Sequence, residues 1–183
     1  MKTRTALLIV PALFALISLN SCCLFFTSDG RCGSSCGGGC AMHANLQGKK
    51  IIATDKAPAA IGPYSQAVLV GKTLYLSGQI AIDPATGELV RDGIEKETRR
   101  VLDNIGAVLS AAGMDFADVV QVQVFLRDLD HYSKMNAIYA EYFKTDFPAR
   151  AAVQVARLPR DVSIEIMCTA VKGAGRNSRA PRN

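Results

Sequence analysis

PARAAVQVARL at residues 148–158, followed by IEI at residues 164–166, tells more about this chain than any other part of it. Both segments are built from small and apolar residues and read as short, largely buried strands. Among these residues, Arg150 near the start of the first segment and Glu165 in the middle of the second are ionisable side chains set into apolar surroundings. A planar guanidinium beside a carboxylate in mostly apolar surroundings suits a small substrate that carries its own carboxylate and reacts with water.

Arg150 enters a strand that we predict over residues 151–156. Strand alternation places it on one face with Ala152 and Gln154 and leaves Val153 on the opposite face. Most arginines form surface ion pairs, and that alternative holds for Arg150 on pattern alone. The preceding proline and the small neighbours, which leave room beside the guanidinium, favour a binding role instead.

Glu165 lies between two isoleucines in a strand that we predict over residues 163–172. A glutamate in an apolar strand loses hydration unless it is partnered, and a buried one can act as a general base towards water. The alternative is a solvated carboxylate on an edge strand, and the pattern alone does not separate the two. Cys168 shares its face with the isoleucines and is predicted as a core residue.

The rest of the domain predicts the order β-β-β-α-β-α-β-β. The expected segments are strands at 50–54, 66–70, 73–77 and 120–126 and helices at 94–112 and 131–143. Gly113 is the expected end of the first helix, Asp130 the expected N-cap of the second, and Val120 is expected on the buried face of its strand. Both helices have one apolar stripe, which predicts an α+β fold with a mixed sheet and two helices on one face.

The second face of this sheet also carries apolar residues, among them Val153 and Val155, so we expect the chain to oligomerise through it.

The weaker site candidates are Tyr64, Ser77 and Asn136, because each of these residue types alone is more often found in a turn or as a cap. The sequence contains no phosphate-binding loop, dinucleotide-binding glycine pattern or paired-histidine motif. We therefore expect no cofactor and no catalytic metal.

Composition fits one domain with appendages, because 49% of the 183 residues are hydrophobic and 20% are charged. The formal charge of +5 comes largely from the two ends of the chain, including a basic tail over 173–183 that we expect to be disordered. The domain between them is close to neutral. The absence of Trp and of any basic run interleaved with aromatics argues against nucleic acid as a partner.

The N-terminal segment resembles a secretory signal. Lys2 and Arg4 precede an apolar run over 6–19, which is shorter than the roughly 20 residues of a membrane-spanning helix. The following LNSC resembles a bacterial lipobox, so we expect residues 1–22 to direct export and Cys22 to carry a lipid that anchors the protein to a membrane. Ordinary secretion to the periplasm, or a cytoplasmic protein in which the segment is not used, are the alternatives.

Residues 23–48 are rich in cysteine and glycine and predict a flexible tether. Cys32, Cys36 and Cys40 could together bind a metal. Their spacing matches no established metal motif and lacks a fourth ligand, so adventitious disulfides are the preferred interpretation.

Five segments between residues 50 and 172 resemble the RidA/YjgF family of imine and enamine deaminases. They are APAAIGPYSQA at 57–67, SGQI at 77–80, LDNI at 102–105, VFLRDL at 124–129 and the opening stretch at 148–166. The resemblance implies a chorismate-mutase-like domain over 49–172 that forms a homotrimer with active sites between subunits. It also implies hydrolysis of 2-aminoacrylate, 2-iminopropanoate and 2-iminobutanoate to 2-oxoacids and ammonia.

Carried onto this sequence, the resemblance implies that Arg150 binds the substrate carboxylate and that Glu165 positions the attacking water. The implied pocket-lining residues are Tyr64, Ser77, Gly78, Asn136 and Ala152. Ala152 replaces a cysteine common in the family, which removes any thiol-based mechanism. Typical members of the family are cytosolic, so the expected export of this chain is a second departure from the family. Endoribonuclease action and a noncatalytic trimer that binds small carboxylates or unfolded clients are the alternative functions.

Overall fold

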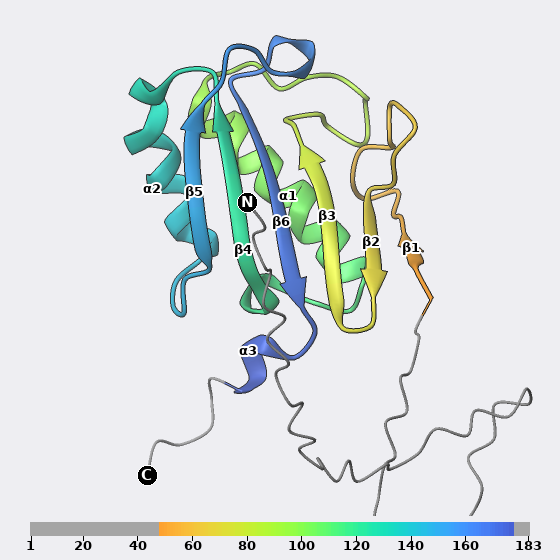
Figure 1. Ribbon diagram of the computed structural model, residues 1–183. Helices are drawn as coiled ribbons and strands as arrows, with labels where there is room; N and C mark the ends of the chain where they lie inside the picture. Colours follow the sequence, from red (N-terminus) through yellow and green to blue (C-terminus); the bar gives the residue numbers. More distant parts are fainter. Residues whose placement is uncertain (1–47, 178–183) are drawn as a thin grey trace, which may run out of the picture. The chain divides into compact units, whose positions relative to one another are not determined.

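The computed structural model describes residues 48–177, which form a six-stranded mixed sheet with two long helices on one face (Figure 1). The elements are β1 (Lys50–Ile52), β2 (Ala67–Val70), β3 (Thr73–Gln79), α1 (Ile94–Ala111), η1 (Phe116–Asp118), β4 (Val119–Leu126), η2 (Leu129–His131), α2 (Tyr132–Tyr142), β5 (Ala149–Gln154), η3 (Pro159–Asp161), β6 (Ile164–Val171) and α3 (Ala174–Asn177). The predicted α+β order of strands and long helices is confirmed. The predictions for the signal segment, Cys22 and the cysteines of the tether lie outside the described residues.

The strand order is β1-β2-β3-β6-β4-β5, so the last strand of the chain lies inside the sheet. Only β4 and β5 are parallel; the other neighbours are antiparallel. The parallel pair requires a crossover, which α2 provides, because parallel strands cannot be joined by a tight turn. β5 therefore forms one edge of the sheet, beside α2.

The core lies between the sheet and α1, which crosses behind β6 and β3 in Figure 1. Every member of the predicted apolar stripe of α1 is buried: Ile94, Val101, Leu102, Ile105, Val108, Leu109 and Ala112. Gly113 has a φ of 68°, the left-handed conformation that a helix-ending glycine adopts without steric cost. The predicted extent and end of this helix are confirmed.

Two local predictions are wrong. Val120 is 38% exposed, because the β4–β6 register shifts between Val119 and Gln121 and turns Val119 into the core instead. Asp130 does not cap α2. The carboxylate of Asp128 accepts a hydrogen bond from the Asp130 amide at 2.9 Å and caps η2, the short 3₁₀ turn that leads into α2.

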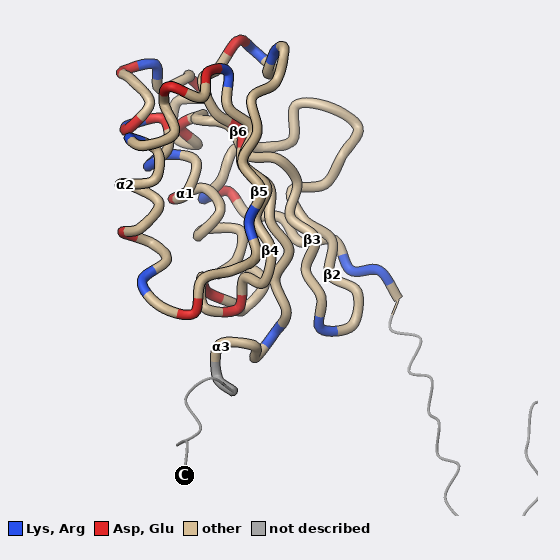
Figure 2. The backbone as a smooth tube through the Cα atoms, turned by 60° about the vertical axis from the view of Figure 1, so that its left-hand side comes forward, with Lys and Arg blue, Asp and Glu red and all other residues tan. Residues whose placement is uncertain are grey.

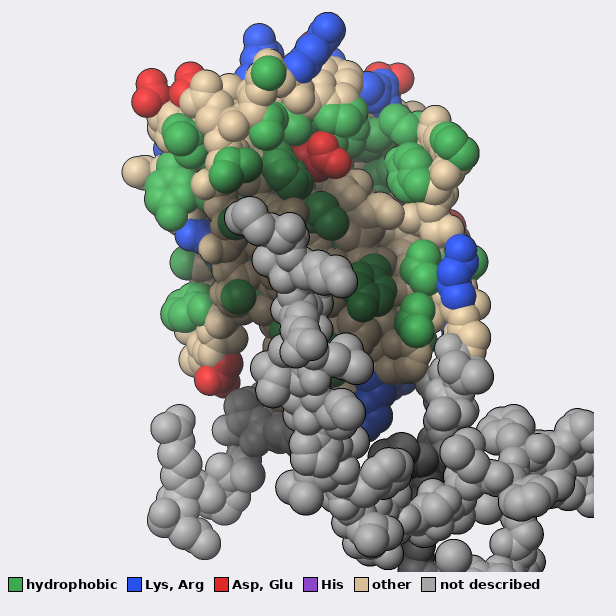
Figure 3. Space-filling view, in the orientation of Figure 1, with side chains coloured by type: hydrophobic (Ala, Val, Ile, Leu, Met, Phe, Trp, Pro, Cys, Tyr) green, Lys and Arg blue, Asp and Glu red, His purple; other side chains and the backbone are tan. Residues whose placement is uncertain are grey.

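The sheet face turned away from α1 and α2 is covered by no long helix of residues 48–177, and we call it the open face (Figure 1). Hydrophobic side chains lie on it among polar side chains and backbone (Figure 3). The registers place Ile51, Val70, Tyr75 and Val153 on this face, and each is between 44% and 54% exposed. Val153 was predicted here. Val155 lies beyond β5 and packs against a small second cluster that includes Leu158.

The C-terminal end of the described chain continues past the predicted domain boundary at residue 172. The Asp118 carboxylate accepts a hydrogen bond from the Gly173 amide at 2.9 Å, and the short helix α3 follows. The first residues of the expected tail are therefore helical, and residues 178–183 lie outside the description. No helix within residues 48–177 is long and apolar enough to cross a membrane.

Candidate active site

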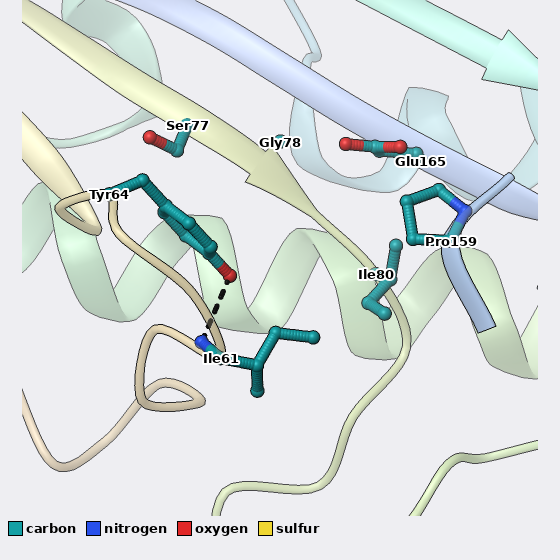
Figure 4. Close-up of a pocket in the computed structure, with 7 residues that line it drawn as sticks. All are labelled: Ile61, Tyr64, Ser77, Gly78, Ile80, Pro159 and Glu165. Carbon is teal, nitrogen blue, oxygen red and sulfur yellow. Dashed lines mark hydrogen bonds between the residues drawn. The ribbon is translucent and has the colours of Figure 1, made fainter.

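A pocket on the open side of the sheet contains four of the predicted site residues (Figure 4). Its volume is about 250 Å³, the size of a small metabolite. The lining residues are Ile61, Tyr64, Ser77, Gly78, Ile80, Pro159 and Glu165. The structure therefore brings Tyr64, Ser77, Gly78 and Glu165 together from three separate segments of the chain.

Strand β3 shapes this pocket through an irregularity beside Glu165. The register between β3 and β6 shifts between Leu76 and Gln79, so Ser77 and Gly78 lie in a bulge opposite the start of β6. A Cβ atom on Gly78 would collide with the carboxylate of Glu165. Glycine is required here because the carboxylate occupies the space that any side chain would need.

Tyr64 is held by a loop that Gln66 organises from inside. The buried Gln66 side chain donates to the carbonyl oxygens of Thr54 and Pro58 at 3.0 and 2.8 Å, and its oxygen accepts from the Thr54 amide at 2.7 Å. The Tyr64 hydroxyl accepts from the Ile61 amide at 3.4 Å. Gln66 was not predicted as a site residue, although a glutamine beside a proline-rich loop can satisfy the polar groups of that loop's backbone.

Glu165 is half-buried, and its carboxylate has no hydrogen-bond or ion-pair partner among residues 48–177. Burial raises its pKa, because the charged form loses hydration without compensation. A carboxylate with a raised pKa is a stronger base towards water than an ordinary surface glutamate. The predicted role of Glu165 therefore fits its surroundings.

Arg150 belongs to a second group of residues, between β5 and α2. Its Nη2 donates to the Tyr132 hydroxyl at 3.2 Å, and its guanidinium carbon lies 4.5 Å from the centre of the Tyr139 ring. Within the described part of the chain no carboxylate lies within ion-pair distance of this exposed guanidinium. Arg150 is thus ordered by aromatic side chains while its charge remains available to a ligand.

The ring beneath Arg150 is itself rigidly packed. Tyr139 is buried and stacks on Phe143 with a centroid distance of 4.3 Å, and Phe143 meets Phe116 edge-on at 5.2 Å. Burial raises the pKa of Tyr139 to about 12, so this ring stays neutral at physiological pH. The column of rings gives the guanidinium a rigid support.

Asn136 and Ala152, the remaining predicted site residues, accompany Arg150. A hydrogen bond from Asn136 and the positive charge of Arg150 lower the pKa of Tyr132. Ala152 follows Arg150 on the same strand face and packs against the core. Tyr132 and Tyr139 were not predicted as site residues, although the spacing of 132, 136 and 139 places them with Asn136 on one face of a helix.

The two groups lie on opposite faces of the sheet. Glu165 pairs with Phe125, which pairs with Val153 on the open face. Arg150 pairs with Val122, a buried residue of the helix-covered face. Within one chain, therefore, the guanidinium and the carboxylate do not lie side by side as their apolar strands suggested.

Residues 54–172 match the family model described as Endoribonuclease L-PSP. The chain is 54% identical over 125 residues to a Bos taurus protein named 2-iminobutanoate/2-iminopropanoate deaminase, a match that covers 68% of this chain and 91% of the relative. The Homo sapiens protein of the same name is 52% identical over 125 residues, with the same coverage.

Solved structures agree with these sequence matches. A putative endoribonuclease from Thermotoga maritima has 54% identity and a TM-score of 0.66, covering 67% of this chain and 97% of its own. The yjgF gene product of E. coli has 46% identity and a TM-score of 0.65, covering 67% and 98%. With its fold, motifs and matched length in agreement, the chain belongs to the Endoribonuclease L-PSP family, also known as the RidA/YjgF family.

Proposed function

We propose that this protein hydrolyses small 2-imino acids to 2-oxoacids and ammonia, with 2-iminopropanoate, 2-iminobutanoate and their enamine tautomers such as 2-aminoacrylate as the substrate class. The observation that carries the proposal is the pair of unpartnered ionic groups, Arg150 on its aromatic support and Glu165 in its pocket. Relatives at 52–54% identity are named for this activity. The enzyme class is a hydrolase acting on C–N bonds.

Each group has a defined part in the proposed reaction. Arg150 binds the substrate carboxylate through two parallel N–H donors, which a planar guanidinium supplies and an ammonium does not. Glu165 accepts a proton from water as the water oxygen bonds to the imine carbon. With the imine nitrogen protonated at the start, this addition gives a neutral carbinolamine, and Glu165 returns the proton to its amino nitrogen. The C–N bond then breaks and ammonia leaves as the hydroxyl oxygen forms the C=O bond and gives its proton to the Glu165 carboxylate. One water is consumed per imine.

The complete site requires a second copy of the chain. Arg150 and Glu165 lie on opposite faces of the sheet, so a substrate of this size cannot touch both within one chain. We place the β5–α2 edge of one copy over the Glu165 pocket of the next. Exposed apolar side chains line that pocket, namely Ile61 and Tyr64, and others such as Val153 lie on the same sheet face. They support such a contact because it would remove them from water.

This arrangement joins two different surfaces, and repeated head-to-tail contacts of that kind form a ring when the rotation between successive copies closes. The smallest ring consistent with the resemblance is a homotrimer with three sites. Light scattering of the full-length chain tests it. A trimer is the expected result, and a monodisperse monomer at micromolar concentration would contradict the shared site.

Turnover is tested with imines generated in situ from several amino acids by an amino-acid oxidase or a dehydratase, with release of 2-oxoacid and ammonia as the readout. Equal amounts of the two products are expected. Activity confined to RNA cleavage would favour the endoribonuclease function. Equal numbers of basic and acidic side chains over residues 49–172, interspersed along the backbone in Figure 2, argue against an RNA-binding surface.

Binding of 2-oxoacids without turnover would favour the noncatalytic alternative.

The location of the protein is a separate proposal. The pattern of residues 2–22 supports export, with lipidation at Cys22. Mass spectrometry of the mature N-terminus tests it. A lipid-modified Cys22 is expected, and an unprocessed Met1 in cytosolic protein would contradict it.

A further inference from the structure

The Tyr132 hydroxyl lies between a strand residue and a helix residue that both act on it. Arg150 donates to its oxygen through Nη2 at 3.2 Å. Asn136 follows one helical turn along α2, on the same face of the helix, and its side chain lowers the pKa of Tyr132. Tyr132 therefore connects the helix residue Asn136 to the strand residue Arg150.

Two different constraints act on the guanidinium. The Tyr139 ring lies 4.5 Å from the guanidinium carbon and holds the group over its face, but this contact leaves the group free to turn about the axis to the ring. The hydrogen bond from Nη2 to Tyr132 removes this second freedom, because it fixes the direction of one N–H. Only with both constraints does Arg150 present a single defined edge to a ligand.

We propose that Tyr132 is a positioning residue that selects which edge of Arg150 receives the substrate carboxylate, and that Asn136 acts through Tyr132 rather than by contact with the substrate. The inference rests on the proposed function in one respect, the role of Arg150 in carboxylate binding. It extends that function, because the Tyr132 hydroxyl on α2 would determine how the substrate carboxylate is oriented.

The first test compares Tyr132→Phe with wild type in the full-length protein. The variant keeps the ring and loses only the acceptor. Ordering a long side chain costs a few-fold in affinity, so we expect 2-oxobutanoate binding to weaken about fivefold. The KM for 2-iminobutanoate should rise by a similar factor while kcat changes little. Tyr142→Phe is the matched control, because it removes a hydroxyl of the same helix that donates to Asp103 at 2.7 Å, outside the site.

A double-mutant cycle tests the order of action. Asn136→Ala alone should weaken 2-oxobutanoate binding, by less than Tyr132→Phe does. In the Tyr132→Phe background the same change should have no further effect, because its only route to Arg150 has gone. Equal losses from Asn136→Ala in both backgrounds would show that Asn136 contacts the ligand directly and would overturn its assignment.

A pH series gives a readout that a merely structural role would not produce. Asn136 and Arg150 lower the pKa of Tyr132, and ionisation creates a phenolate that competes with the ligand carboxylate for Arg150. Arg150 from β5 is the charged group that faces Tyr132; Tyr139 and Cys168 behind it have pKa values raised to about 12. Binding of 2-oxobutanoate should therefore weaken at alkaline pH in wild type, weaken only at higher pH in Asn136→Ala, and stay level in Tyr132→Phe.

The outcomes separate this inference from the proposed function. Wild-type affinity and an unchanged alkaline limb in Tyr132→Phe, with binding lost in Arg150→Lys, would overturn the inference alone. Absence of wild-type turnover would refute the proposed function, while the binding measurements would still decide the role of Tyr132.

Discussion

Replacing Gly78 with alanine tests how tightly the pocket is built around Glu165. The added Cβ would collide with the Glu165 carboxylate, and its next neighbours are the carboxyl carbon at 2.8 Å and Cγ at 3.2 Å. The backbone at Gly78 is not in the left-handed region, so alanine introduces no strain of its own there. The carboxylate must therefore move.

The size of the effect follows from that displacement. Turning Glu165 away from its rotamer costs on the order of 1 kcal/mol, which the domain should tolerate. A displacement of about 1 Å in a catalytic group can cost roughly a hundredfold in rate. We expect Gly78→Ala to fold normally and to lose about two orders of magnitude in kcat, with a smaller change in 2-oxobutanoate affinity.

The assay is steady-state deamination of 2-iminobutanoate, with circular dichroism and thermal unfolding as checks on folding. Gly62→Ala is the matched control. It lies in the loop beside Tyr64, and its added Cβ would meet that ring at an ordinary 3.6 Å. If folded Gly78→Ala keeps kcat within about threefold of wild type, the space beside Glu165 is not what the reaction depends on, and the reasoning fails.

Two further predictions concern the charged groups themselves. Arg150→Lys should lower kcat/KM roughly a hundredfold, because one ammonium cannot make the two-point contact with the substrate carboxylate. The circular dichroism spectrum should stay unchanged. Near wild-type turnover in this variant would contradict the assignment of Arg150 to carboxylate binding. Glu165→Gln should lower kcat about a hundredfold and leave 2-oxobutanoate affinity within a few-fold. Because burial raises the pKa of Glu165, wild-type kcat should fall as the pH drops through that raised pKa. The pH profile of the glutamine variant should lack this acid-side fall in kcat. The same fall in both proteins would show that another group titrates.

Patterns of local sequence predicted the scaffold well. The stripe of α1 and its end at Gly113 follow from helical periodicity and glycine conformation, and both are confirmed. The predicted burial of Val120 was wrong because a one-residue register shift reverses the faces of a strand, and sequence alternation alone does not reveal such a shift. The predicted N-cap role of Asp130 was wrong because a 3₁₀ turn precedes α2, and Asp128 caps that turn.

The structure brings some of the predicted site residues together and separates others. Tyr64, Ser77 and Glu165 come together in one pocket as expected. Arg150 lies on the other face, since strand registers are set by tertiary pairing rather than by the residues of one strand. Tyr132 was overlooked because an aromatic at helical spacing is normally a packing residue.

The central claim is that Arg150 of one copy and Glu165 of another act on one substrate molecule. Mixing the inactive variants Arg150→Lys and Glu165→Gln after partial unfolding and refolding tests it directly. In a randomly mixed head-to-tail ring, about a quarter of the sites receive an intact arginine from one copy and an intact glutamate from its neighbour. We predict recovery of about a quarter of wild-type deaminase activity in the equimolar mixture. A mixture of verified mixed oligomers as inactive as its two components would contradict the shared site.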